Sequence, residues 1–189
     1  RKLDYSIQIS KLFYERFIKN AEITLFSPNH VPDLYEAFGM PEFDSLYLKY
    51  EKDKSIPKQT IGAQELFQAL LKERAETGRI YIMNLDHCNT HSSFKDKVYM
   101  SNLCQEITLP TTPVQHIDDK EGEIALCILS AINLGLLTDM NELEELCDLS
   151  VRALDEIIDY QEYPVEAAKI SAQSRRSLGI GYIGLAHYL

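Results

Sequence analysis

The feature that most constrains the fold is the order of elements between residues 58 and 84. Residues from about 58 to 77 carry apolar side chains at helical spacing, and Gly78 stands where a left-handed residue would end a helix. Residues 79–84 form an apolar run that is typical of a buried strand. A helix, a glycine cap and an apolar strand in this order make an α/β unit, so the sequence predicts the α/β fold class.

Composition excludes several classes of protein. The 189 residues suit one globular domain, and 45% hydrophobic with 25% charged residues is typical of a folded chain. A net charge of −10 disfavours nucleic acid or an anionic membrane as a partner. The chain has no apolar run of about 20 residues and no signal peptide. Its four cysteines are too few and too scattered for a disulfide scaffold, so we expect a cytoplasmic protein.

Periodicity and turn residues predict the remaining elements. We expect helices at about 5–20, 34–38, 42–52 and 139–160, a helix opening at Pro164, and strands at 23–26 and 124–129. Asp33 is expected to cap the second of these helices.

The segment Ser101–Pro110 carries the chemistry. If it is extended, Asn102, Cys104 and Glu106 share one face, because side chains alternate along a strand. An amide, a thiol and a carboxylate could then orient a hydroxylated substrate, attack it and move a proton. The spacing alone favours a half-buried strand that carries a core cysteine, because such polar faces are common in strands.

The residues at these positions make the interpretation more specific. Asn-Leu-Cys-x-Glu followed by Ile-x-Leu-Pro resembles the finger loop of the large subunit of class I ribonucleotide reductases. Residues 78–82, 86–92, 122–127 and 176–181 resemble the same subunit, in the same order, so the resemblance covers essentially the whole chain in its bacterial and phage form. Cobalamin-dependent class II enzymes have a similar loop, and the wider match favours class I.

The resemblance implies part of a ten-stranded α/β barrel, made of two parallel half-barrels with the finger loop at its centre. Residues 1–78 would be mainly helical and include a possible docking region for the small subunit. Residues 79–135 would supply strands and the finger loop, and residues 136–189 would supply helices of the second half-barrel. Both ends look cut, so we expect an internal or split fragment that is inactive in isolation.

The resemblance also implies the reaction, which is reduction of ribonucleoside diphosphates to 2′-deoxyribonucleoside diphosphates. Cys104 would become a thiyl radical that removes the 3′-hydrogen, Glu106 would act as the base, and Asn102 would orient the substrate hydroxyls. Cys127, by composition a core residue, would be one half of the redox cysteine pair, with its partner absent from this chain.

The implied partners follow from the same family. A small subunit with a dimetal centre would supply the radical, and the remainder of the large subunit would complete the enzyme. Thioredoxin or glutaredoxin would restore the thiols, and ATP and dNTP effectors are implied for the full enzyme. We expect this chain itself to bind no cofactor and no metal.

Three other patterns carry less weight. His87-Cys88-x-x-His91 lacks the second ligand pair of a zinc site, so we expect no metal here. The resemblance instead implies that residues 86–92 are a structural loop at the entry to the active-site region. The spacing Gly179-x-Gly181-x-x-Gly184 lacks the preceding strand and the later acidic residue of a dinucleotide motif. The resemblance implies a packed segment beside the barrel. Cys147 is expected in the core, on the apolar side of its helix.

A second function stays open. The chain could be a non-catalytic interaction module that binds the small subunit through its early helices. Phe13 and Phe17 would line such a docking groove, and they are equally well explained as core residues.

Overall fold

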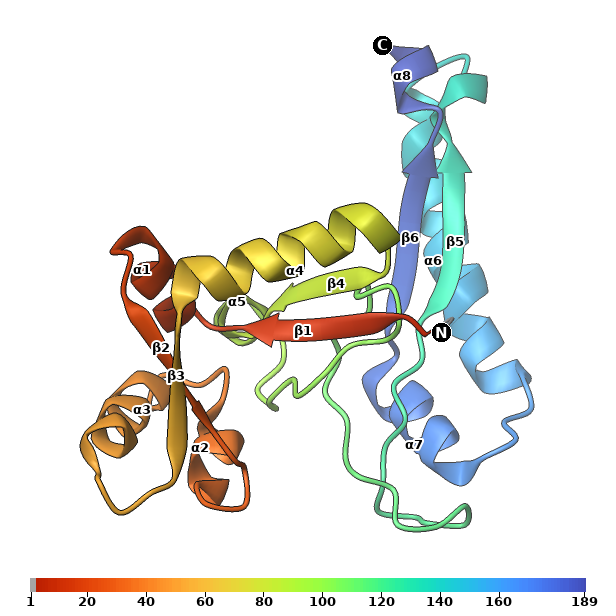
Figure 1. Ribbon diagram of the computed structural model, residues 1–189. Helices are drawn as coiled ribbons and strands as arrows, with labels where there is room; N and C mark the ends of the chain where they lie inside the picture. Colours follow the sequence, from red (N-terminus) through yellow and green to blue (C-terminus); the bar gives the residue numbers. More distant parts are fainter. Residues whose placement is uncertain (1–2) are drawn as a thin grey trace. The chain divides into compact units, whose positions relative to one another are not determined.

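The computed structural model describes residues 3–189, which fall into two compact units, one up to residue 110 (unit 1) and one from residue 111 to 189 (unit 2) (Figure 1). Unit 1 contains β1 (Tyr5–Ile9), α1 (Lys11–Ile18), β2 (Glu22–Phe26), α2 (Pro32–Ala37), α3 (Phe43–Lys52), β3 (Lys58–Gly62), α4 (Ala63–Thr77), β4 (Ile80–Asn84) and α5 (Leu85–Thr90). Unit 2 contains β5 (Ile128–Asn133), the 3₁₀ turn η1 (Leu134–Leu136), α6 (Asn141–Tyr160), α7 (Glu166–Arg175), β6 (Leu178–Ile183) and α8 (Leu185–Tyr188).

Unit 1 contains two strand pairs. β1 and β4 are parallel, in register from Tyr5 opposite Ile80 to Ile9 opposite Asn84, whereas β2 and β3 are antiparallel. Parallel strands require a long crossover, and here every element from α1 to α4 lies within it. Helix α4 packs on β4 and on α1. The presence of both helices and paired strands confirms the predicted α/β class.

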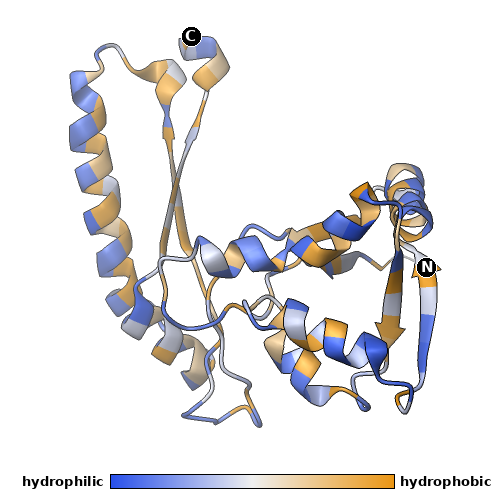
Figure 2. Ribbon diagram, turned by 90° about the vertical axis from the view of Figure 1, so that its left-hand side faces the viewer, coloured by the Kyte–Doolittle hydropathy of each residue, from blue (hydrophilic) through white to orange (hydrophobic). Residues whose placement is uncertain are grey.

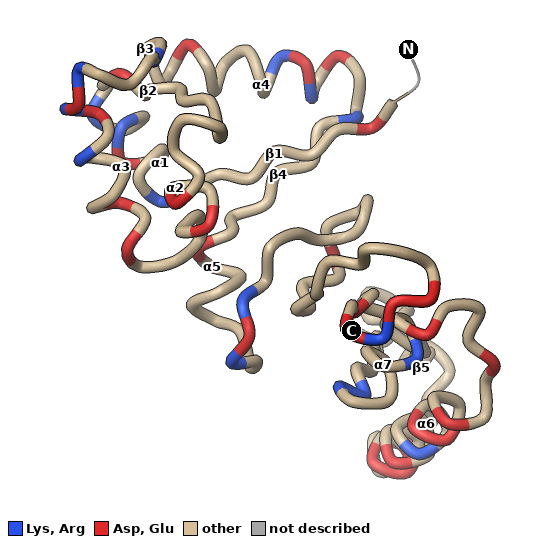
Figure 3. Tube along the Cα trace, turned by 90° about the horizontal axis from the view of Figure 1, so that it is seen from below, with Lys and Arg blue, Asp and Glu red and all other residues tan. Residues whose placement is uncertain are grey.

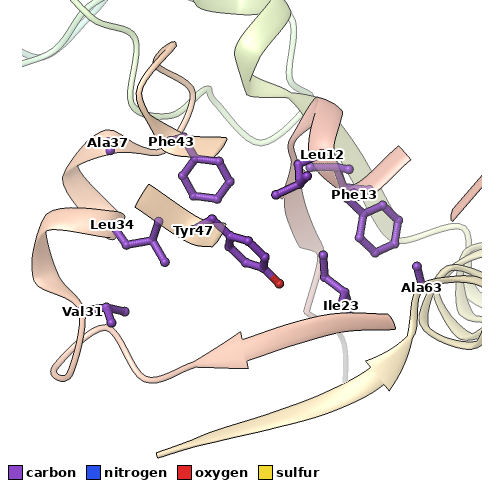
Figure 4. Packing of buried hydrophobic residues seen from close by; sticks show 10 residues of the cluster. Leu12, Phe13, Ile23, Val31, Leu34, Ala37, Phe43, Tyr47 and Ala63 are labelled. Carbon is purple, nitrogen blue, oxygen red and sulfur yellow. The ribbon is translucent and has the colours of Figure 1, made fainter. Parts of the chain in front are cut away.

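The core of unit 1 combines aliphatic side chains with packed aromatic rings, among them Phe13, Phe43 and Tyr47 (Figure 4). Phe43 packs edge-on against Phe38 with 4.9 Å between ring centroids, and Phe26 packs edge-on against Tyr47 at 5.5 Å. The buried Tyr47 hydroxyl donates to the Thr24 carbonyl at 2.8 Å and accepts from the Thr24 N–H at 2.6 Å. Burial of each such side chain stabilises the fold by about 1.5–3 kcal/mol, and the hydrogen bonds fix α3 on β2.

A half-buried ion pair lies beside this core. Arg16 donates to both carboxylate oxygens of Glu51, at 3.0 and 2.6 Å, and the Thr24 hydroxyl donates to the same carboxylate at 2.9 Å. Burial alone would raise the pKa of the Glu51 carboxyl, but these hydrogen bonds and the Arg16 charge together lower it. The network links α1, β2 and α3.

Unit 2 is organised around one parallel strand pair and one long helix. β5 and β6 pair from Ile128 opposite Leu178 to Asn133 opposite Ile183, and α6 packs on both strands. Figure 2 shows apolar and polar residues alternating along α6, and Figure 3 shows the acidic residues that gather on it. The buried set is small and rich in alanine: Ile132, Leu154, Ile158, Ala167, Ala168, Ser171 and Ala172.

The predicted helix at 5–20 is wrong in its first part, because residues 5–9 are strand β1. Ile7 and Ile9 alternate with polar residues, which suits a strand that pairs with β4 as well as it suits a helix. Helix α1 begins after Ser10, whose hydroxyl caps it by accepting the Phe13 N–H at 3.4 Å.

The predicted helix at 58–77 begins later than expected. Residues 58–62 form β3 against β2, and α4 starts after Gly62. Its predicted end is confirmed: Gly78 has φ 67° and donates its N–H to the Arg74 carbonyl at 2.8 Å. Strands β2 and β4 and helices α3 and α6 also confirm their predictions.

Three smaller predictions are wrong. The strand expected at 124–129 lies at 128–133, because the Ile124 N–H donates to the Ala167 carbonyl before the pairing with β6 begins. Asp33 is in the first turn of α2 and Val31 is its N-cap. Cys147 is exposed, because packing covers its side of α6 only toward the helix C-terminus.

The expected barrel is not formed by these residues alone. Within residues 3–189 the strands form three separate two-stranded pairs, and these sheets do not close. None of the helices in the described range is long and apolar enough to cross a membrane.

Candidate active site

The segment from Ser101 to Ile107 is a turn, so the extended conformation predicted for it is wrong. The Gln105 N–H donates to the Asn102 carbonyl at 3.1 Å, which makes Cys104 the third residue of a β-turn. Gln105 adopts a left-handed conformation with φ 66°. Alternation along a strand therefore does not explain how the candidate residues are presented.

Side-chain hydrogen bonds close this turn into a loop, which we call the Cys104 loop (residues 101–107). The Asn102 Oδ1 accepts the Ile107 N–H at 3.0 Å, and the Ser101 hydroxyl donates to the Ile107 carbonyl at 2.6 Å. Because an N–H needs an oxygen acceptor, the orientation of the Asn102 amide is defined. Its carbonyl oxygen stabilises the loop, and its NH₂ makes no hydrogen bond to another residue of the described range.

The candidate groups all reach solvent. Asn102, Cys104 and Glu106 are exposed, so the alternative of a core cysteine in a half-buried strand is wrong. The loop presents a thiol and a carboxylate two residues apart, with an amide at its entry. One short loop therefore exposes a thiol that can act as a nucleophile or hydrogen-atom carrier and a carboxylate that can accept a proton.

Sequence reasoning missed the role of Ser101. It treated this residue only as the start of the segment, whereas its hydroxyl ties the two ends of the loop together. The signal was present, because Ser-Asn is a pair typical of turns.

Cys127 lies in unit 2, immediately before β5, and is half-buried. Burial raises the pKa of its thiol. A Cβ atom at Gly179, on β6, would lie 2.8 Å from the Cys127 Sγ and 2.5 Å from Leu129 Cδ2. The glycine therefore makes room for the thiol, a role that the sequence did not reveal because Gly179 was considered only as part of a glycine-spacing motif.

That motif is not a phosphate loop. Gly179 and Gly181 lie within β6, and the preceding element is helix α7, as predicted. Gly184 follows the strand with φ 72° and leads into the four-residue α8. A dinucleotide motif needs its glycines in the turn after a strand, and two of the three are inside the strand here.

The loop expected for the histidine-cysteine pattern is wrong, because His87 and Cys88 lie on helix α5 and His91 is its C-cap. The rings of His87 and His91 are 5.8 Å apart, and Cys88 packs against the small apolar cluster of Met83, Leu85 and Val98. Burial raises the pKa of the Cys88 thiol. Within residues 3–189, no group of three or more His, Cys, Asp or Glu side chains is arranged to hold a metal ion.

The early aromatic residues belong to the core. Phe13 is buried, and Phe17 packs against the same cluster with its ring 5.1 Å from that of Phe67. Of the two explanations offered for these residues, packing in the core is the one that the structure supports.

Comparison with known proteins identifies one family over the whole length of the chain. The family model for the barrel domain of ribonucleotide reductase matches residues 1–189. The ribonucleoside-diphosphate reductase subunit alpha of Buchnera aphidicola subsp. Schizaphis graminum is 58% identical over 194 residues, covering 100% of this chain and 25% of the relative. Subunit alpha of reductase 1 from Escherichia coli K12 is 57% identical, and subunit alpha from Enterobacteria phage T4 is 42% identical, each over 100% of this chain and 26% of the relative.

The chain thus spans about a quarter of the length of the curated relatives that it matches. The family match extends over both units, including the Cys104 loop and Cys127. This chain belongs to the ribonucleotide reductase family and matches its barrel domain.

Proposed function

We propose that this chain supplies the radical-bearing loop of a ribonucleotide reductase large subunit, which reduces ribonucleoside diphosphates to 2′-deoxyribonucleoside diphosphates. The observation that carries the proposal is the exposed Cys104 on a loop that also presents Asn102 and Glu106, in a chain matched by the family along its whole length. The small subunit supplies the radical that starts the reaction.

The proposed steps use the groups of the loop in turn. Cys104 loses a hydrogen atom to become a thiyl radical and then takes the hydrogen atom from C3′ of the ribose, which re-forms S–H and leaves a carbon radical. Glu106 accepts the proton of the 3′-hydroxyl, and the NH₂ of Asn102 donates to a ribose oxygen. The 2′-hydroxyl leaves as water after it takes up a proton.

The redox balance requires a second site. Two electrons and two protons come from a cysteine pair, which becomes a disulfide, and Cys104 finally returns a hydrogen atom to C3′. Cys127 is the proposed member of that pair in this chain, and its partner is expected outside residues 1–189. The net reaction converts one ribonucleotide and one dithiol into one deoxyribonucleotide, one disulfide and one water.

Two features support this assignment of roles. The Cys104 loop is closed by its own hydrogen bonds, which keeps an exposed thiol in a defined place without packing it. Cys127 is half-buried with a raised thiol pKa, so it remains protonated near neutral pH and can donate a proton as well as electrons.

The rest of the proposal follows the family. The parallel pairs β1–β4 and β5–β6 are the pieces that this chain would contribute to the two parallel half-barrels. Thioredoxin or glutaredoxin would reduce the disulfide, nucleoside triphosphates would act as effectors of the full enzyme, and the cytoplasm would be the compartment.

Reduction of cytidine diphosphate tests the proposal. The chain is mixed with the small subunit and dithiothreitol, with and without the segments that complete the large subunit. We expect activity only in the complete mixture, and we expect Cys104→Ser to lower it by about 10³-fold or more. Cys147→Ser is the matched control, because Cys147 is also exposed and lies on α6, outside the proposed site.

The competing function is a non-catalytic module that binds the small subunit. It predicts binding by the folded chain with no reductase activity in any mixture, and equal behaviour of Cys104→Ser and Cys147→Ser. That result would overturn the catalytic proposal. The burial of Phe13 in the core already removes one of the residues that such a docking groove would use.

A further inference from the structure

Residues 97–99, just before the Cys104 loop, lie outside helices and strands and are held by side-chain hydrogen bonds to other elements. Val98 is 0% exposed and packs against Met83 and Leu85. Val98 belongs to neither a helix nor a strand, so its backbone N–H and C=O are not paired within regular secondary structure. A buried backbone N–H and C=O must nevertheless find partners, since leaving either unpaired is destabilising.

Asn89 provides both partners. Its Oδ1 accepts the Val98 N–H at 2.8 Å, and its Nδ2 donates to the Val98 carbonyl at 3.0 Å. The same Nδ2 donates to the Leu85 carbonyl at 3.2 Å, one helical turn back in α5. A side-chain amide thus takes the place of a neighbouring strand and ties Val98 to α5.

Neighbouring residues hold the same segment from other elements. Gln8, on β1, donates from Nε2 to the Tyr99 carbonyl at 2.7 Å. The Lys97 ammonium donates to the Glu36 carbonyl on α2 and lies 4.4 Å from the centre of the Tyr99 ring. Residues 97–99 are therefore attached to three elements of unit 1.

The absence of a side chain at Gly39 leaves space for the Asn89 amide. Gly39 has φ 79°, and a Cβ atom there would lie 3.0 Å from Asn89 Nδ2 and 2.6 Å from Leu85 Cγ. A glycine at this position leaves the space in which the amide reaches Val98.

From these contacts we propose that Asn89 is a positioning residue for Cys104, an inference that rests on the proposed function. The Cys104 loop is closed on itself, so its place depends on how residues 97–99 are attached. Asn89 makes two hydrogen bonds of that attachment, which satisfy both backbone groups of Val98, and a third holds its own amide on the Leu85 carbonyl of α5. It touches no reacting atom and acts by setting where the thiol stands relative to the β1–β4 sheet.

The test compares Asn89→Ala with Gln64→Ala. Gln64 is a matched control, because its Nε2 donates to the Phe17 carbonyl at 3.1 Å in the same unit, with no link to the loop. In the reconstituted reductase, we expect Asn89→Ala to lower kcat for cytidine diphosphate by about a hundredfold, since misplacement of about 1 Å has effects of that size. KM should rise as well, because Asn102 and Glu106 lie on the same loop and their contacts with the ribose shift with it.

Hydrogen exchange supplies a readout that does not depend on activity. In Asn89→Ala the amides of Val98 and Ile107 should exchange about tenfold faster than in Gln64→Ala, while amides of β2 keep their protection. Should Asn89→Ala lose protection in β2, the variant has unfolded, and Asn89→Asp replaces it. That carboxylate still accepts the Val98 N–H and has no donor for the Val98 carbonyl, so an intermediate loss of kcat is expected.

The outcomes distinguish failure of the proposed function from failure of the positioning role of Asn89. If Cys104→Ser keeps full activity, the proposed function is wrong. If Cys104→Ser is inactive while both Asn89 variants keep kcat within about twofold of Gln64→Ala, the reaction stands and the positioning role is overturned.

Discussion

The two units hold the candidate cysteines Cys104 and Cys127 by different means. Unit 1 has a core of packed aromatic rings and presents Cys104 on an exposed loop held by hydrogen bonds. Unit 2 has a small buried set rich in alanine, and it keeps Cys127 half-buried against Gly179 at the start of a strand. An exposed thiol is not positioned by packing. The loop that carries it must therefore be fixed by hydrogen bonds and attached to a stable core. A thiol beside a strand can be positioned by close contact alone.

The largest expected effect is on the core of unit 1. Phe43 is 8% exposed, and its ring contacts those of Phe38 and Tyr47. Phe43→Ala should lower the free energy of unfolding by about 3–5 kcal/mol, through lost burial and the cavity left behind. Urea denaturation of the 189-residue chain, followed by circular dichroism, measures the change.

Leu149→Ala is the control in unit 2, since Leu149 is 62% exposed on α6. It should change stability by less than about 0.5 kcal/mol. If both variants lower the free energy of unfolding equally, the aromatic cluster is not the main source of stability in unit 1, and the contrast drawn between the units is wrong.

A smaller effect is expected from the ion pair that links α1, β2 and α3. Glu51→Gln should lower the free energy of unfolding by about 1.5–3 kcal/mol at pH 7, because it weakens charge-assisted hydrogen bonds from Arg16 and Thr24. Arg152→Ala removes an exposed pair with Asp148 and should have an effect of at most about 0.5 kcal/mol.

The pH dependence sharpens this test. Folding lowers the pKa of Glu51, so its contribution is complete above the unfolded value of about 4.3 and is lost as pH falls through the lower folded value. The stability difference between the unmodified chain and Glu51→Gln should therefore shrink in acid. A difference that stays constant from pH 7 to about pH 3 would contradict the assignment.

Controls apart, the smallest of the expected stability effects is at the contact that holds Cys127. Gly179→Ala places a methyl group against the Cys127 thiol and Leu129, and such overpacking lowers stability by about 1–3 kcal/mol. The displaced thiol should lose part of its burial, so its pKa should fall toward the ordinary value and it should react faster with iodoacetamide at pH 8. Mass spectrometry of the labelled peptide reports the rate.

Gly181→Ala controls for the loss of a glycine in the same strand. The nearest atom to a Cβ at Gly181 is the Ser130 carbonyl oxygen at 3.9 Å, so this change should be tolerated. If both glycine variants label Cys127 at the same rate, close contact with Gly179 does not position the thiol.

Local sequence predicted the elements whose signals lie within a few residues. Gly78 ends α4 in the left-handed conformation, and β4 and α6 lie where periodicity placed them. Residues 5–9 were misassigned because their apolar spacing fits a strand and a helix equally well. Pairing with β4, some 75 residues later, decides between the two.

In the candidate site, too, some features follow from the sequence and others only from the tertiary structure. The sequence by itself determined the fold class, the family and the identity of the candidate residues Cys104, Glu106, Asn102 and Cys127. Only the tertiary structure decided that the Cys104 loop is a closed turn, that Asn89 anchors its entry, and that Gly179 admits the Cys127 thiol. The physical reason is that these contacts join residues that are distant along the chain or depend on the exact backbone path, whereas periodicity and capping report only on neighbours.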